Sequence, residues 1–139
     1  MIETLVLAFG IGVVSGLRTF TSLAAVFLRQ SGFGYAGIIM GVAALGEYVA
    51  DLSPKIPSRT SFPSNAVRAV SGAIAAWFLT VAHGGEPIAG AIAGVVGAGI
   101  GTYGGHAARV AAIARLGAIP AGIAEDVVAI VLAAAIVTR

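Results

Sequence analysis

Long apolar stretches alternate with short polar ones along the whole chain. Between successive charged side chains lie gaps of 17 residues (30–46), 17 residues (69–85) and 22 residues (87–108). A helix needs about 20 residues to cross a hydrocarbon core about 30 Å thick. The pattern therefore predicts a bundle of about five transmembrane helices, over residues 4–28, 35–52, 66–82, 88–116 and 121–138.

Turn signals separate these segments. Residues 53–64 contain three prolines and four serines, so they are expected to form a loop. Ser64 or Asn65 is expected to cap the helix that follows. Residues 83–87 read His-Gly-Gly-Glu-Pro, which predicts a tight turn, and Pro120 is expected to open the last helix. Residues 1–139 then form a single transmembrane domain.

The first apolar segment is interrupted near its middle. Residues 16–22 carry Arg18 and the hydroxyl side chains of Thr19, Thr21 and Ser22. A guanidinium near the centre of a bilayer costs about 2.5–3.5 kcal/mol on insertion scales, so Arg18 is expected to have partners inside the protein. The segment is either one long tilted helix or a broken, re-entrant pair of half-helices.

The composition agrees with a membrane protein. Hydrophobic residues make up 58% of the chain and charged residues 10%, whereas charged residues make up about 25% of an ordinary soluble domain. The mean hydropathy is +1.00. The first apolar segment lacks the positively charged start of a signal peptide, so we expect it to be retained as a span. These features predict an all-α, multi-pass membrane protein.

Several other classes of protein are not expected. The net charge is only +2, and no basic run with interleaved aromatic residues suggests binding to nucleic acid. The chain has no cysteine, and it lacks a phosphate-binding loop, a zinc-ligand spacing and a nucleophile–base set. We therefore expect neither an enzyme nor a bound cofactor.

The distribution of lysine and arginine predicts an orientation. With five spans, one side of the membrane holds Lys55, Arg59 and Arg68 together with Arg109 and Arg115. That side is expected to be cytoplasmic, with the amino terminus inside and the carboxyl terminus outside. A re-entrant first segment reverses this assignment.

The remaining charged side chains gather at one depth under the five-span arrangement, with Arg18 reaching toward them from the middle of the membrane. We interpret the group as an ion or solute pathway, because ionisable residues in membrane segments converge on the bundle interior or on a wet cavity. The alternative is a salt-bridge network that only fixes the packing. The candidate pathway residues are Arg18, Thr19, Thr21, Glu47, Asp51, Arg68, His106, Arg109, Glu125 and Asp126.

Different roles are expected within this group. Glu47 and Arg18 are least able to reach water, so they are the strongest functional candidates. The acidic pairs Glu47–Asp51 and Glu125–Asp126 suit proton or cation handling, while Arg18 remains charged and acts as an anchor. Metal binding by His106 and divalent-cation binding by the acidic pairs are weaker alternatives. The hydroxyl groups often bond back to helix carbonyls instead of lining a path.

Glycines recur at spacings of four residues, as in Gly12/Gly16, Gly90/Gly94 and Gly97/Gly101. This pattern predicts close helix packing within the protomer or a dimer, with exposure of bare backbone to a ligand as the alternative. An arginine followed by a pair of acidic residues occurs twice in the chain. The first set is Arg18 with Glu47 and Asp51, and the second is Arg109 with Glu125 and Asp126. This order suggests an inverted repeat, a layout common in transporters.

The chain resembles a family of small bacterial integral membrane proteins catalogued as the domain of unknown function number four-one-two-six. The resemblance rests on Gly-Leu-Arg-Thr at 16–19, Glu-Tyr-Val-Ala-Asp at 47–51, Arg68 before Gly-Ala at 72–73, Gly-Gly-His at 104–106 before Arg109, and Glu-Asp-Val at 125–127. It implies a helical membrane fold and important charged positions, but no catalytic residues. The chain differs from the family pattern at Ser22, where a proline is usual, and at Leu52 and Ala107–Ala108, where lysines are usual.

Three functions follow as expectations. The first is a carrier or channel for an ion or small polar solute. It is expected to be a dimer, because a chain of 139 residues is small for enclosing a pathway. This function predicts that Glu47→Gln abolishes flux without loss of the fold. The second is binding or flipping of an anionic lipid by Arg18, Arg68 and Arg109. The third is a scaffold subunit of a membrane complex, contacting a partner helix through the glycine faces.

Overall fold

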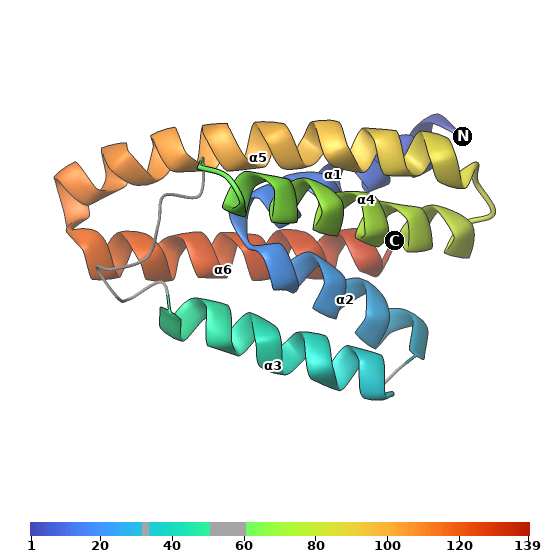
Figure 1. The fold of residues 1–139 in the computed structure, drawn as a ribbon, viewed down its shortest axis with the longest axis horizontal. Coiled ribbons are helices and arrows are strands. Elements are labelled where there is room, and N and C mark those ends of the chain that lie inside the picture. The colour runs from blue at the N-terminus through green and yellow to red at the C-terminus, as the bar shows by residue number, and fades with distance from the viewer. Residues whose placement is uncertain (32–33, 51–60) are drawn as a thin grey trace.

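The computed structural model describes residues 1–31, 34–50 and 61–139, and this part of the chain forms six α-helices and no strand. Successive helices run in opposite directions, and both termini lie at one end of the bundle (Figure 1). The all-helical class is confirmed, whereas the described residues hold six helices instead of the expected five. The helices are α1 (Ile2–Leu17), α2 (Thr19–Ser31), α3 (Tyr35–Ala50), α4 (Ser64–Ala82), α5 (Pro87–Leu116) and α6 (Ala118–Val137).

The extra helix arises because the first apolar segment breaks at Arg18. This residue has an extended backbone (φ −143°, ψ 113°), and α2 then runs back along the bundle (Figure 1). The reversal places the two termini together, so that Glu3 and Arg139 line one cavity. The first segment is therefore broken, which was one of the two alternatives, and the termini lie at one end of the bundle, whereas five spans would place them at opposite ends.

The ends of the other helices follow the turn signals closely. The N-cap of α4 is Pro63 and not Ser64 or Asn65, which are already helical. At the turn before α5, Gly84 has a φ of +67°, and the carboxylate of Glu86 accepts a hydrogen bond from the Ala89 nitrogen at 2.7 Å. That carboxylate satisfies one of the unpaired N–H groups of the first turn. Most of the predicted proline-rich loop lies outside the described residues.

Glycines let α5 pack directly on the backbones of α1 and α4. A Cβ atom built at Gly97 or Gly101 would lie within 3.0 Å of α1 backbone atoms, and one at Gly94 would meet Gly72 of α4 in the same way. The predicted packing within the protomer is thus confirmed for these glycines. In contrast, Gly99 and Gly104 face open space.

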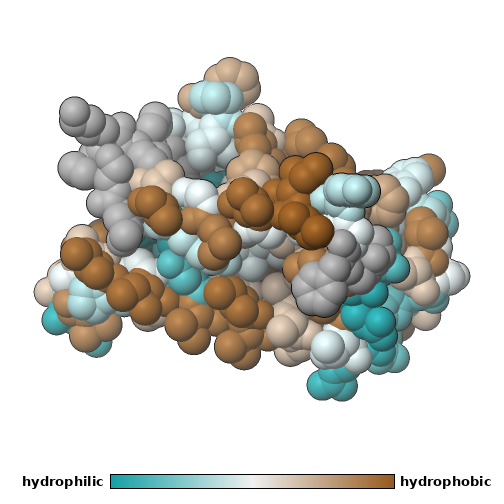
Figure 2. Space-filling model, turned by 90° about the horizontal axis from the view of Figure 1, so that it is seen from below, coloured by the Kyte–Doolittle hydropathy of each residue, from teal (hydrophilic) through white to brown (hydrophobic). Residues whose placement is uncertain are grey.

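The outer surface is largely apolar. Large side chains such as Ile39, Ile100 and Ile119 are more than half exposed, and hydrophobic residues cover much of one face (Figure 2). Three helices, α4, α5 and α6, are long and apolar enough to cross a membrane, and α1 and α3 are shorter apolar helices. An apolar surface of this extent is what a lipid environment requires, so the fold supports a multi-pass membrane protein.

Candidate functional site

Arg18 lies at the reversal between α1 and α2, inside the bundle. Its side chain is only 1% exposed. The Nη2 atom forms an ion pair with Oδ1 of Asp126 on α6 and lies 3.8 Å from Oε2 of Glu125. The guanidinium carbon also lies 5.5 Å from the centre of the Tyr48 ring, within the range of a cation–π interaction. The partners that the sequence required for a buried arginine are therefore present, on α3 and α6.

Glu47 of α3 occupies the amino-terminal end of α2. Its Oε1 accepts a hydrogen bond from the Thr19 nitrogen at 2.9 Å, and its Oε2 accepts one from the Phe20 nitrogen at 3.0 Å. A helix that begins inside the protein has unpaired N–H groups and a partial positive charge at its first turn. The carboxylate supplies both the acceptors and the opposite charge, which explains how the chain starts a new helix directly after Arg18.

Arg68 of α4 ties this helix start to the end of α1. Its Nη2 lies 3.5 Å from Oε1 of Glu47, and its Nη1 donates a hydrogen bond to the Gly16 carbonyl at 2.8 Å. The Arg68 carbonyl in turn accepts a hydrogen bond from the Ser15 hydroxyl at 2.8 Å. The end of α1 and the start of α2 are thus held together by one buried cation and its carboxylate partner.

A third ion pair extends the network onto α5. Nη1 of Arg109 lies 3.2 Å from Oε2 of Glu125. The same oxygen is the one near Arg18, so Glu125 stands between two guanidinium groups. The described part of the network therefore contains three arginines and three carboxylates, and its charges balance.

Hydroxyl groups line the reversal and bond to the protein itself. Ser71 donates a hydrogen bond to the Thr19 carbonyl at 2.6 Å, and Ser22 donates to the same carbonyl at 3.1 Å. The Thr21 hydroxyl lies 2.6 Å from the Tyr48 hydroxyl. Back-bonding to a helix carbonyl, the alternative weighed for these residues, is observed for Ser22.

Two predicted site residues are not part of the observed network. His106 lies on α5, three residues before Arg109, and forms no hydrogen bond or ion pair within the described residues. Asp51 falls outside the described residues. In the part of the chain that the structure covers, no group of three or more His, Cys, Asp or Glu side chains is placed to hold a metal ion.

Tyr48, Ser15 and Ser71 are site residues that sequence reasoning did not assign. Two of them had usable signals, since Tyr48 follows Glu47 directly and Ser71 lies one turn after Arg68 on the same helix face. The position of Ser15 opposite Arg68 depends on the crossing of α1 and α4, which no local pattern predicts.

Among the described residues, the acidic side chains of α3 and α6 make different kinds of contact. Arg18 pairs with Asp126, and Arg68 pairs with Glu47, so each ion pair joins distant parts of the chain. The first arginine stands at a helix break, whereas Arg109 lies within the unbroken helix α5. These contacts give the suggested inverted repeat no support.

The chain was compared with family models, curated proteins and solved structures. No family model, curated protein or solved structure matches this chain.

Proposed function

We propose that this protein is a small carrier or channel of the bacterial inner membrane that moves an ion or a small polar solute. The observation that carries the proposal is the buried reversal at Arg18, where a non-helical residue and three ion pairs meet between apolar helices. Non-helical backbone at membrane depth is tolerated where it is buried in protein or lines a water-filled cavity. Transporters use discontinuous helices of this kind to build their substrate sites.

The arrangement of Glu125 suggests how the network changes state. Arg18 has two carboxylates within reach, because Asp126 forms its ion pair and Glu125 lies 3.8 Å away. A proton or cation that binds Asp126 would weaken the first pair, and Arg18 would then turn to Glu125. Arg109 keeps Glu125 in place, since the two already pair at 3.2 Å. In this proposal Asp126 takes up the moving charge, Arg18 is the group that changes partner, and Glu125 is its second partner.

Glu47 receives a different role from the one expected on sequence grounds. Both of its oxygens accept backbone hydrogen bonds at the start of α2, and Arg68 lies beside one of them. These contacts engage both carboxylate oxygens in holding the start of α2. We therefore assign Glu47 to holding the reversal and place the transfer step on α6.

Binding of an anionic lipid by Arg18, Arg68 and Arg109 has weaker support. Each of these arginines already forms an ion pair with a carboxylate, so little net positive charge remains for a head group. The scaffold function rests on the sequence pattern alone.

A second copy of the chain is part of the transport proposal. Of the six helices in the described residues, α1, α2 and α3 have only 16, 13 and 16 residues, so one copy encloses a pathway poorly. Beyond the level of the other helices, α5 and α6 continue as an apolar hairpin (Figure 1). Val110, Leu116 and Ile119 on this hairpin are more than half exposed. A dimer mass released from gentle detergent in a native mass spectrometer would support the proposal, and a bare monomer would count against it.

Flux into liposomes tests the function directly. Liposomes containing the full chain are compared with protein-free liposomes for uptake of protons, K⁺ and Cl⁻, read with ion-sensitive dyes, and for swelling in urea and glycerol. Transport predicts that one of these fluxes exceeds the protein-free control. Equal fluxes for the whole panel would contradict the proposal.

A further inference from the structure

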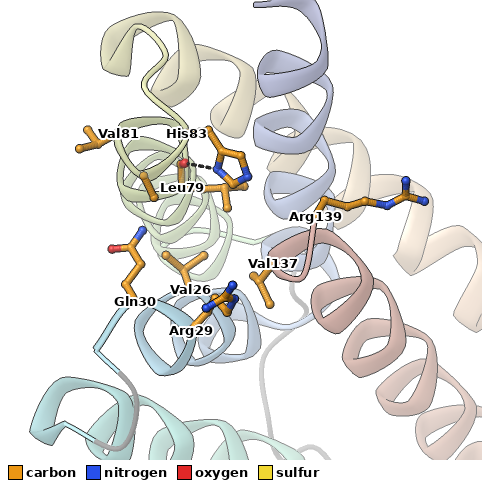
Figure 3. Close-up of a pocket in the computed structure, with 9 residues that line it drawn as sticks. Val26, Arg29, Gln30, Leu79, Val81, His83, Val137 and Arg139 are labelled. Carbon is orange, nitrogen blue, oxygen red and sulfur yellow. Dashed lines mark hydrogen bonds between the residues drawn. The ribbon is translucent and has the colours of Figure 1, made fainter.

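A second group of polar side chains lies at the opposite end of α2 from Arg18. Here α2, α4 and α6 all end, and a cavity of about 490 Å³ opens between them (Figure 3). Arg29 and Gln30 from the last turn of α2 line it, together with His83 at the end of α4. Arg139 also borders the cavity, but its side chain extends away from Arg29 (Figure 3).

A second cavity continues from this one along α2. It has a volume of about 470 Å³ and lies between α2, α3 and α6. Its walls are mostly apolar and include the small residues Ala25, Gly41, Ala44 and Ala133. Arg29 and Val137 line both cavities, so the polar chamber and the apolar groove meet at these two residues.

The far end of the apolar groove reaches the charged network without entering it. Thr21 and Tyr48, whose hydroxyl groups bond to each other, line the groove at that end. From Thr21 to Arg29, α2 rises about 12 Å at 1.5 Å per residue. The groove is thus long, narrow and apolar, with an arginine at one end and an internally satisfied hydroxyl pair at the other.

The charges around the chamber favour an anion. Arg29 forms no ion pair or hydrogen bond with any residue that the structure describes, and no Asp or Glu side chain of the described residues lines either cavity. The carboxylate of Glu86, in the turn after α4, accepts a hydrogen bond from the backbone nitrogen of Ala89 and lines neither cavity. The Gln30 amide donates one hydrogen bond to the Phe78 carbonyl at 2.7 Å and has a second N–H to offer.

We infer that the two cavities together bind one anionic phospholipid. The phosphate lies in the chamber beside Arg29 and Gln30, and an acyl chain lies in the groove along α2, between α3 and α6. The chamber is at the level where helices end, which is where lipid head groups are found. A guanidinium and an amide N–H are donors that suit a phosphate group. This site lies at the other end of α2 from the network proposed to carry transport, and it uses none of the arginines of that network.

Native mass spectrometry of the full chain, released from nanodiscs of equal parts phosphatidylglycerol and phosphatidylcholine, tests the inference. The wild-type protein is expected to retain phosphatidylglycerol in preference to phosphatidylcholine. Arg29→Gln should lower that preference about fivefold, as expected when one arginine no longer attracts an anionic lipid. Arg115→Gln, an exposed arginine at the end of α5, is the matched control and should keep the wild-type preference.

A second pair of variants tests the acyl chain. A Cβ atom at Gly41 meets no other atom within 4 Å, so a side chain can start there toward the groove. Gly41→Leu should therefore occupy part of the groove and reduce retention of both lipids. Gly99→Leu also enters open space but lies outside the groove, and it should leave retention unchanged.

Three results would overturn the inference. The first is equal retention of the two lipids by the wild-type protein, and the second is an unchanged preference in Arg29→Gln. The third is loss of a dimer mass in Gly41→Leu with normal lipid retention, which would assign the groove to a second copy of the chain. None of them depends on the flux measurements, so the lipid site and the transport function can fail separately.

Discussion

The carboxylate of Glu47 lies on the first turn of α2, with its Oε1 atom 2.9 Å from the backbone nitrogen of Thr19. This contact joins α3 to the first residue of α2, directly after Arg18, which is the non-helical residue between α1 and α2. It also explains why the chain reverses there without a proline or a turn sequence. The buried helix start is completed by a side chain 28 positions further along the chain.

Removing that cap should destabilise the fold. Glu47→Ala leaves two buried N–H groups without their acceptor and removes the carboxylate partner of Arg68. We expect a loss of about 3–5 kcal/mol, the usual cost of removing one partner of a buried ion pair. Glu47→Gln keeps one carbonyl acceptor and should cost about 1–3 kcal/mol. Unfolding in a denaturing detergent titration measures both. A stable Glu47→Gln protein that has lost all flux would instead favour the proton-handling role.

Arg18 and Asp126 should behave as a coupled pair. Arg18→Gln or Asp126→Asn alone removes one member of a buried ion pair, and each should cost about 3–5 kcal/mol. The double variant should be less destabilised than the sum of the two by about 0.5–3 kcal/mol, because it leaves no unpaired member. Thermal unfolding of the four proteins in one detergent gives this coupling. Strict additivity would mean that the contact contributes nothing.

The glycine face of α5 should be intolerant of any side chain. At Gly97 a Cβ atom would lie within 3.0 Å of the α1 backbone at Phe9, so Gly97→Ala should separate the helices and lower the unfolding temperature. Gly99→Ala is the matched control, because that position faces open space, and it should stabilise the helix by about 0.5–1 kcal/mol. Similar melting temperatures for the two variants would argue against the close packing of α1 and α5.

Tyr48 should contribute through its ring and its hydroxyl separately. Tyr48→Phe removes the hydrogen bond to Thr21 but keeps a ring near Arg18, and we expect a loss of about 0.5–1.5 kcal/mol. Tyr48→Leu also removes the cation–π contact and should cost a further 0.5–2 kcal/mol, roughly. Comparison of the two unfolding curves separates these contributions. Equal curves would show that the ring has no interaction with Arg18.

The helical class and most helix boundaries could be predicted from the sequence, because apolar length and turn residues are local signals. The tight turn before α5 and the segments of α3 and α5 are examples. The reversal at Arg18 could be posed only as one of two alternatives, since its cause is the contact of α2 with Glu47. The sequence signalled that Arg18 needed partners, but not which carboxylates they were.

Pairing within the site depended on the order in which the helices pack. Arg109 and Glu125 are 16 residues apart, on two helices joined by a tight connection. A contact between them is therefore of the kind that sequence can suggest. The Arg18–Asp126 pair bridges the two ends of the chain and follows from the placement of α6 beside α1 and α2. The periodicity of apolar residues within one helix does not predict which distant helix it packs against.

The most direct test of the account is the flux of Asp126→Asn relative to the wild-type protein, at equal protein content in liposomes. The Arg18–Asp126 pair is the proposed moving part, so we expect at least a tenfold slower flux (about 1.4 kcal/mol on the barrier) in Asp126→Asn, while Arg115→Gln keeps the wild-type rate. The folded state of each variant is checked by its melting temperature in the same lipid. An unchanged flux in a folded Asp126→Asn protein would contradict the proposal that solute passes through this network.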